Sequence, residues 1–334
     1  MRWPLADDAD QAQQALFGVE AVVERRVGTG EYHGLEFLHV NARRIINEVP
    51  QPARLPFRFT INAYRGCTHA CTYCFARPSH EFLGLDRGRD FDTRIVVKVN
   101  AADRLRVELA HPRWAGDSIA MGTNTDPYQR AEARYHLTRR ITEVLVERAN
   151  PFSVLTKSTL ILRDLDLLAR AAAAGLVRVN LSIGTLDEQV WRATEPGTPH
   201  PARRLEAVAR LNQAGVPCGV LVAPVLPGLS DHPQQLRAVV EGAVAAGAVS
   251  VTPIALHLRP GVREHFLSWL AGYRPDLVGT YTQRYSRAYL PAADQKGLAA
   301  AVAGWQRGCP APEATDGPTR QERPGRASSS QHAE

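Results

Sequence analysis

The chain has 334 residues, a formal net charge of +6, 44% hydrophobic residues and 22% charged residues, which is the composition of an ordinary globular protein of one large or two small domains. No stretch reaches the roughly 18–20 apolar residues of a membrane span, and the N-terminus lacks the pattern of a secretory signal. We therefore expect a cytoplasmic protein with no membrane partner. The positive charge favours a polyanion or an acidic partner protein, although a mildly basic solvated surface explains it equally well.

The two ends of the chain differ from its middle. Residues 1–30 are polar with weak helical periodicity, and we expect a helix over 9–25 within a peripheral N-terminal segment, residues 1–50. A C-terminal helical extension is expected over 261–307. Beyond it, residues 308–334 are rich in Pro, Gly, Ser and charge and cannot bury a core, so we expect a disordered tail there.

The middle of the chain, residues 51–260, alternates short apolar segments with amphipathic segments of 12–15 residues. This alternation predicts βαβ units, and hence an α/β fold with a parallel sheet. About six units fit a partial (βα)6 TIM-like barrel, and an open doubly wound sheet is the alternative. Strands are expected at 57–64, 118–124, 152–158, 177–185, 217–228 and 250–258, a further extended piece at 94–100, and helices at 134–149, 161–175, 201–215 and 233–247.

Polar residues gather where each expected strand ends. In both architectures the chemistry lies at the carboxyl ends of parallel strands. These ends carry three cysteines after the first strand and, after the later ones, "GTNTDPYQ", "TKS", "SIGT", "APVLPGLSD" and "LHLRPG". The pattern therefore predicts one site at this edge of the sheet, independently of any motif.

Three of the five cysteines, Cys67, Cys71 and Cys74, lie in "YRGCTHACTYCFARP" with the spacing C-x3-C-x2-C. One interpretation is a buried stripe, because these positions share one face of a helix, but the segment is poor in helix formers. A second is structural zinc with His69 or a distant residue as fourth ligand, but no second short ligand unit follows. The third, which the residues favour, is a [4Fe–4S] cluster in which one iron has no protein ligand and can activate a small molecule.

With Tyr73 as the aromatic of C-x3-C-x-aromatic-C, the segment resembles the radical S-adenosylmethionine (SAM) superfamily over about residues 57–260. The resemblance implies an enzyme in which the three cysteines hold a [4Fe–4S] cluster and SAM chelates the fourth iron. An electron, from a flavodoxin- or ferredoxin-type donor, then cleaves SAM to a 5′-deoxyadenosyl radical that abstracts hydrogen from the substrate. Such a radical needs a pocket that excludes water.

The loop "MGTNTDPYQRAE" departs from the superfamily's Gly-Gly-Glu, and its "TDPYQ" resembles the spore photoproduct lyase and DNA repair photolyase branch. That resemblance implies SAM contacts from Thr125, Lys157 and Ser182, with Lys157 as a charge-assisted partner of the SAM carboxylate. The alternatives are an Asx/Pro turn in the loop, an exposed lysine and a small core hydroxyl. In the same loop we expect Gly122 to let backbone carbonyls approach the ligand, and Thr123, Asn124, Thr125 and Asp126 to offer acceptor oxygens.

The run "VAPVLPGLSD", which contains Ala223, resembles the superfamily's adenine-binding run. We expect its apolar backbone to pack on the base, and Ser230 or Asp231 to cap the next helix; a plain strand followed by a cap is the alternative. The segments 195–204 and 257–265 are expected to line the same rim and to reach substrate, with structural roles equally open for their histidines.

Three hypotheses for function follow. The first is radical SAM chemistry on a nucleic acid, and the second is the same chemistry on a peptide, protein or small metabolite. The third is a zinc-stabilised binding protein without catalysis. Spore photoproduct lyases, which this loop resembles, carry a cysteine as hydrogen donor at about the place of Thr123. Cys218 does not obviously replace it, because it is expected inside a strand. The resemblance therefore does not imply strict photoproduct lyase activity, and we assign no catalytic side chain.

Overall fold

The computed structural model describes residues 19–50 and 55–309 of the chain. Expectations that fall on residues 1–18, 51–54 and 310–334, including nearly all of the expected disordered tail, lie outside the described residues.

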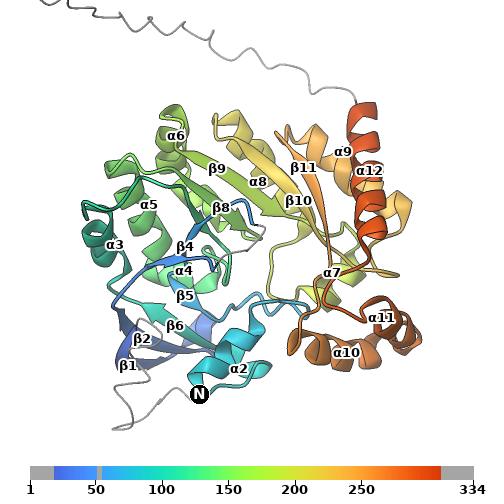
Figure 1. The fold of residues 1–334 in the computed structure, drawn as a ribbon, viewed down its shortest axis with the longest axis horizontal. Helices are drawn as coiled ribbons and strands as arrows, with labels where there is room; N and C mark the ends of the chain where they lie inside the picture. The colour runs from blue at the N-terminus through green and yellow to red at the C-terminus, as the bar shows by residue number, and fades with distance from the viewer. Residues whose placement is uncertain (1–18, 51–54, 310–334) are drawn as a thin grey trace, which may run out of the picture.

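Six parallel strands, adjacent in chain order, form the main sheet (Figure 1). One short strand adds antiparallel to the first of them. The order lacks the reversal that defines a doubly wound sheet, so the expected partial barrel is confirmed and the alternative is wrong. From edge to edge the strands are β3 (Ile46–Glu48), β4 (Phe59–Ile61), β7 (Ile119–Met121), β8 (Phe152–Thr156), β9 (Val177–Ser182), β10 (Cys218–Val225) and β11 (Val251–Ala255).

Amphipathic helices form an arc around the outside of these strands (Figure 1). Their apolar faces join the strands in one core, where Leu145 and Leu211 are buried together with Val154 and Val220. Burial of each such side chain stabilises the fold by about 1.5–3 kcal/mol. The helices are α3 (Ala101–Leu109), α5 (Leu137–Glu147), α6 (Leu165–Ala173), α8 (Pro201–Gln213), α9 (Pro233–Ala245) and α12 (Ala292–Gly308).

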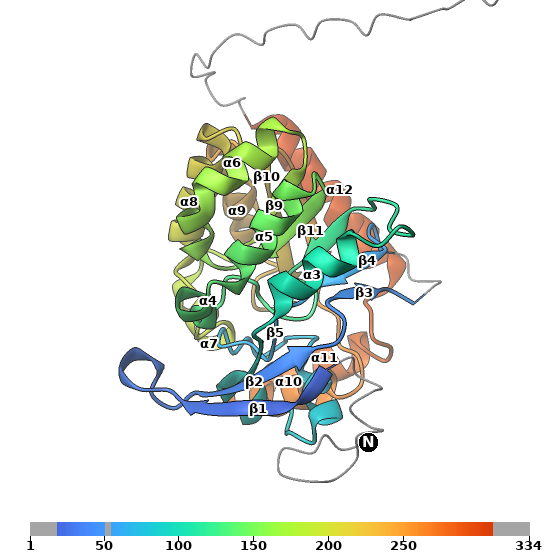
Figure 2. The ribbon, with the colours of Figure 1, turned by 90° about the vertical axis from the view of Figure 1, so that its left-hand side faces the viewer.

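A second sheet, of four strands, lies below the barrel (Figure 2). Its strands are β1 (Val19–Val27), β2 (Glu36–Ala42), β6 (Arg94–Lys98) and β5 (Tyr64–Arg65), in that order. The expected helix over 9–25 is therefore wrong where the structure describes it. Antiparallel pairing of the valine-rich "VEAVVERRV" with β2 overrides the weak helical periodicity.

The single strand expected over 57–64 is divided between the two sheets. Its first part, β4, belongs to the barrel, and its last residue begins β5 of the second sheet. The piece expected at 94–100 is β6, which pairs with β2 and β5 and not with the barrel. The cysteines follow β5, so the chain passes from one sheet to the other immediately before them.

The C-terminal helices α10 (Val262–Tyr273) and α11 (Val278–Arg284) build a smaller core. There Phe266 and Tyr281 are buried in one cluster with Cys71 and Tyr73, so these helices support the cysteine segment. The remaining helical pieces are short: η1 (Gly30–Tyr32), η2 (Arg77–Leu83), α2 (Arg89–Thr93), α4 (Arg130–Tyr135), η3 (Thr159–Asp164), α7 (Glu188–Thr194) and η4 (Pro275–Leu277). Among the described residues, no helix combines the length and the apolar character that a membrane crossing requires.

Candidate active site at the carboxyl ends of the strands

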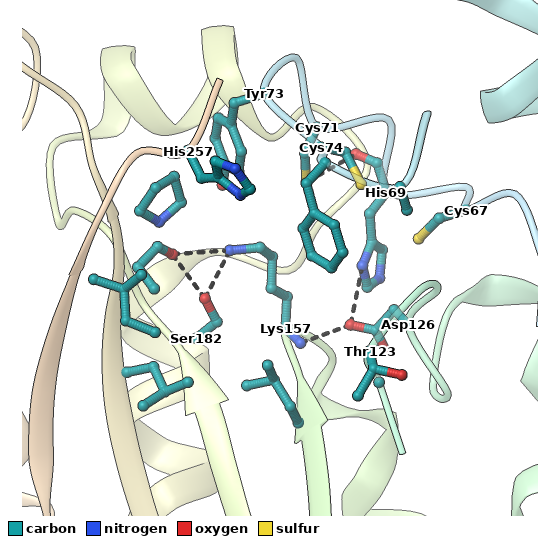
Figure 3. Close-up of a pocket in the computed structure, with 18 of the residues that line it drawn as sticks. Cys67, His69, Cys71, Tyr73, Cys74, Thr123, Asp126, Lys157, Ser182 and His257 are labelled. Carbon is teal, nitrogen blue, oxygen red and sulfur yellow. Dashed lines mark hydrogen bonds and ion pairs between the residues drawn. The ribbon is translucent and has the colours of Figure 1, made fainter. Parts of the chain in front are cut away.

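One pocket opens at the carboxyl ends of the parallel strands (Figure 3). The cysteine loop, residues 66–76, forms one wall, and the ends of β7 to β11 form the others. All the individually expected site residues line it together: Cys67, Cys71, Tyr73, Cys74, Gly122, Thr123, Asn124, Thr125, Asp126, Lys157, Ser182 and Ala223. Of the two segments expected at the rim, 257–265 contributes a residue to the described lining and 195–204 contributes none. His69 and His257 also line this pocket, whereas His265 does not.

The cysteine loop is a series of turns held by its backbone. Gly66, at φ +80°, turns the chain after β5, and its carbonyl accepts hydrogen bonds from Thr125 Oγ1 at 2.6 Å and Gln129 Nε2 at 3.0 Å. The Gln129 amide oxygen accepts from the Thr68 backbone N–H at 3.0 Å. Because residues 66–76 are not helical, the interpretation of the cysteines as a stripe on a helix is wrong.

A buried arginine holds the far side of this loop. The Arg77 guanidinium donates to the Cys71 carbonyl from Nε at 3.1 Å and from Nη2 at 2.9 Å, and it pairs with Asp92 at 2.9 Å. It also donates to the carbonyls of Arg87 and Gly88, each at 3.0 Å. A fork of five donors can satisfy several carbonyl groups at once, so Arg77 fixes the backbone at Cys71, while the thiol makes a long contact, 4.0 Å, with the His69 carbonyl.

The three thiols are poor nucleophiles without a bound metal. Burial raises the pKa of Cys67, Cys71 and Cys74, and for Cys67 the Asp126 carboxylate adds to this effect. Only the thiolate binds a metal, so binding must displace protons. Within residues 19–50 and 55–309, no three His, Cys, Asp or Glu side chains are grouped so that they could hold a single metal ion.

The loop after β7 contains one close approach and one saturated carboxylate. Gly122 has φ +90°, and an added Cβ would lie 1.9 Å from the Leu155 carbonyl oxygen, so glycine is required by the neighbouring strand end. Asp126 accepts hydrogen bonds from Thr156 Oγ1 at 2.6 Å, the Lys157 N–H at 2.7 Å and the Tyr128 N–H at 2.8 Å.

The His69 Nδ1 lies 3.3 Å from the Asp126 carboxylate and ties the cysteine loop to this second loop. Burial alone would raise the pKa of Asp126, but His69 and the hydrogen bonds from Thr156 and Lys157 together lower it. Through the Tyr128 N–H, Asp126 forms the Asx turn that was the alternative interpretation of this loop. Thr125 joins the loop to the cysteine loop through the Gly66 carbonyl. Thr123 has only long contacts with Asn62, at 3.4–3.5 Å, and the Asn124 side chain has no hydrogen bond to the described residues.

Lys157 lies at the centre of a buried polar wall (Figure 3). Its ammonium donates to Ser182 Oγ at 2.8 Å, Glu195 Oε1 at 3.0 Å and the Ala223 carbonyl at 3.2 Å. Ser182 Oγ also donates to the Ala223 carbonyl at 2.7 Å. Three residues expected to contact SAM thus form one hydrogen-bonded unit, and Lys157 is not an exposed strand-end lysine.

Glu195, which sequence reasoning did not single out, is the acid of this wall. It accepts from the Tyr73 hydroxyl and pairs with Arg204 at 2.6 Å as well as with Lys157. Burial by itself would raise the pKa of Glu195, but Arg204, Lys157 and Tyr73 lower it to about 2. With one carboxylate and two cations, the unit keeps a net charge of +1 beside the pocket.

The expected helix cap after β10 is wrong. His232 precedes α9, with no side-chain cap, while Ser230 and Asp231 close the loop before it. Ser230 Oγ accepts from the Leu226 N–H at 2.9 Å, and Asp231 Oδ1 accepts from the Gly228 N–H at 2.7 Å. Asp231 and Ser230 therefore lie one and two residues before the N-cap position, His232, so neither side chain is placed to cap the first helical N–H groups.

The chain is similar to known proteins both in sequence and in fold. The model of the Radical SAM superfamily matches residues 61–238. An uncharacterized protein of Mycobacterium tuberculosis is 46% identical over 291 residues, 86% of each chain. The radical SAM Nα-GlyT isomerase of Pseudomonas phage M6 is 26% identical over 54% of this chain and 35% of its own. The structure of spore photoproduct lyase complexed with dinucleoside spore photoproduct has a TM-score of 0.60 at 17% identity, covering 80% of this chain and 78% of that one.

Proposed function

The chain belongs to the radical SAM superfamily, and we propose that it carries out radical chemistry on a base of a nucleic acid. As a member of this family it is an enzyme whose cofactors are a [4Fe–4S] cluster and SAM. The observation that carries the proposal is that one pocket brings the cysteine loop opposite the Lys157 wall.

The residues present fit both cofactors. Cys67, Cys71 and Cys74 would hold the cluster, because each thiolate of such a cluster binds a different iron and the sulfur atoms need not converge on one point. Lys157 would bind the carboxylate of SAM, since its wall has one cation more than acids. Ser182 and the Ala223 backbone are the polar groups next to Lys157 that could bind other polar atoms of SAM. The side chains of Thr123 and Asn124 have hydrogen-bonding groups that could also bind SAM.

When bound, the two cofactors supply a 5′-deoxyadenosyl radical by one-electron cleavage of SAM. The protein's contribution is to orient the ligand and to keep water away from it. Leu155, Leu221 and Leu256 line the pocket between its polar groups. We further propose that a flavodoxin- or ferredoxin-type protein delivers the electron, since an acidic partner suits a chain of net charge +6.

Two names among the similar proteins support a nucleic-acid substrate. One relative is an isomerase of Nα-GlyT, and one solved neighbour is a lyase complexed with a dinucleoside. The pocket has Thr123 on the loop after β7, and its described lining includes no cysteine besides the three of the motif. We therefore propose a base modification or repair reaction that does not rely on a pocket cysteine as hydrogen donor.

Anaerobic reconstitution tests the proposal. We expect about four irons per chain, and formation of 5′-deoxyadenosine from SAM under a strong reductant. Single-stranded DNA should increase this cleavage, and deuterium from DNA labelled in its bases should appear in 5′-deoxyadenosine. Binding of one equivalent of zinc, without SAM cleavage, would refute the assignment of the chain as a radical SAM enzyme. Cleavage that responds to peptides or small metabolites, and not to DNA, would refute the substrate.

A further inference from the structure

The mouth of the pocket exposes apolar and aromatic surface. Phe75, on the cysteine loop, is 44% exposed, and Ile254, at β11, is also 44% exposed. Both line the same pocket as the three cysteines, and so does His257. Exposed aromatic residues at the entrance of a site are a usual feature of ligand binding, and the chemistry described above uses none of them.

A second aromatic ring, that of Tyr289, packs on His257 at this mouth. The His257 and Tyr289 rings stack with centroids 4.0 Å apart and planes 10° from parallel, and Tyr289 is 59% exposed. The pair is fixed by its backbone: the two residues form a β-bridge, and the Leu258 N–H donates to the Ala288 carbonyl at 2.8 Å. Burial and the nearby Arg259 lower the pKa of His257, so near neutral pH the imidazole is uncharged.

Arg259 contributes a positive charge beside the Phe75 ring. Its guanidinium carbon lies 5.9 Å from the centroid of the Phe75 ring, and its Nε is buried with no hydrogen-bond partner. Among the described residues no carboxylate pairs with Arg259. The one acid in the pocket lining, Asp126, is saturated by its own contacts. The mouth therefore combines aromatic surface with an uncompensated positive charge.

We propose that Phe75, His257, Tyr289 and Arg259, which we call the aromatic mouth, bind an unpaired nucleotide of single-stranded DNA. The base stacks on the aromatic rings, and Arg259 binds an adjacent phosphate. Stacking platforms beside positive charge are how proteins hold single strands. A neutral peptide would use the rings but would leave the Arg259 guanidinium without an anionic partner. This inference rests on the proposed function and specifies where the substrate enters.

Binding of a fluorescently labelled 12-nucleotide oligo-dT to the full-length reconstituted protein tests it, by anisotropy. Tyr289→Ala and Phe75→Leu should each weaken binding by about 5- to 100-fold, the usual cost of losing one stacked base. Tyr289→Phe should bind like the wild type, because it keeps the ring. The matched control is Tyr273→Ala, since Tyr273 also stacks on an aromatic residue, but that residue, Trp269, does not line this pocket, whereas His257 does. Iron content and thermal unfolding establish that each variant is folded and loaded.

Two further measurements separate the base from the phosphate. An abasic oligonucleotide of the same length should bind wild type and Tyr289→Ala equally, because it offers phosphates without rings. Arg259→Gln should lower the slope of log K against log salt by about 0.7. If wild type binds the oligonucleotide and the Tyr289 and Phe75 variants bind it equally well, the aromatic mouth is wrong and the proposed function stands. If wild type binds duplex and not single strands, the inference is also wrong. If it binds no DNA at low salt, the nucleic-acid substrate itself is wrong.

Discussion

The two walls of the pocket are built in opposite ways. The cysteine loop is fixed mainly through its backbone, by Arg77, Thr125 and Gln129, with a side-chain link from His69 to Asp126. The opposite wall is fixed through charged side chains, with Lys157, Glu195 and Arg204 bound to one another. The first arrangement leaves its functional atoms free for an incoming group. The second must keep its charges compensated whether or not a ligand is present.

This difference predicts that substitutions in the cysteine loop abolish cluster binding without unfolding the protein. Substitutions in the Lys157 wall should instead lower the free energy of unfolding. The largest effect is expected for Cys71→Ala, which should remove the cluster and SAM cleavage together. Iron analysis, visible absorption and assay of 5′-deoxyadenosine measure this. Cys218→Ala is the control, because Cys218 is buried in β10 and not in the pocket. Retained cleavage in Cys71→Ala would contradict the assignment of the loop.

Glu195→Gln should lower the free energy of unfolding by about 3–5 kcal/mol, because it leaves Lys157 and Arg204 buried without their acid. Urea denaturation of the protein without cofactors measures the loss. Glu188→Gln is the matched control: its pair with Arg192, at 2.7 Å, is largely exposed and should contribute under 1 kcal/mol. Equal effects of the two changes would show that the wall is not a buried network.

The same carboxylate should give the protein a specific acid sensitivity. Its pKa is about 2 when folded against an ordinary value of 4.5, so its stabilisation is complete above pH 4.5 and is lost as the pH falls from 4.5 towards 2. The shift corresponds to about 3 kcal/mol. Unfolding of wild type and Glu195→Gln, measured at several pH values, should converge on acidification. A constant difference across this range would contradict the lowered pKa.

Lys157→Met should weaken SAM binding by about 10- to 100-fold, the range expected for loss of a charge-assisted hydrogen bond of 1.5–3 kcal/mol. Equilibrium dialysis with labelled SAM measures the change, and the iron content should stay constant. Lys296→Met, on the exposed surface of α12, controls for the general loss of a positive charge. Unchanged SAM affinity would remove Lys157 from the proposed site.

The sequence was informative where function depends on spacing and periodicity. The alternation of apolar and amphipathic segments predicted the partial barrel, and the cysteine spacing with the strand-end residues predicted which side chains meet. It was uninformative where a role depends on a distant partner. Arg77, Glu195 and Arg204 lie in segments that the sequence did mark, but only the folded chain shows that Arg77 is buried against Asp92 and the Cys71 carbonyl, and that Glu195 and Arg204 are buried against each other. The same reason explains β1, since its pairing with β2 cannot be seen in its weak periodicity.

The division of one expected strand between two sheets has a consequence for any shortened form of the protein. β5, directly before Cys67, pairs only with β6 among the described strands, and β6 in turn depends on β2, which lies between residues 36 and 42. A fragment beginning at residue 51 would keep every pocket residue and yet reduce this sheet to two strands, which are marginally stable alone. The smallest piece of the chain that can present its cysteines correctly therefore begins well before the barrel does.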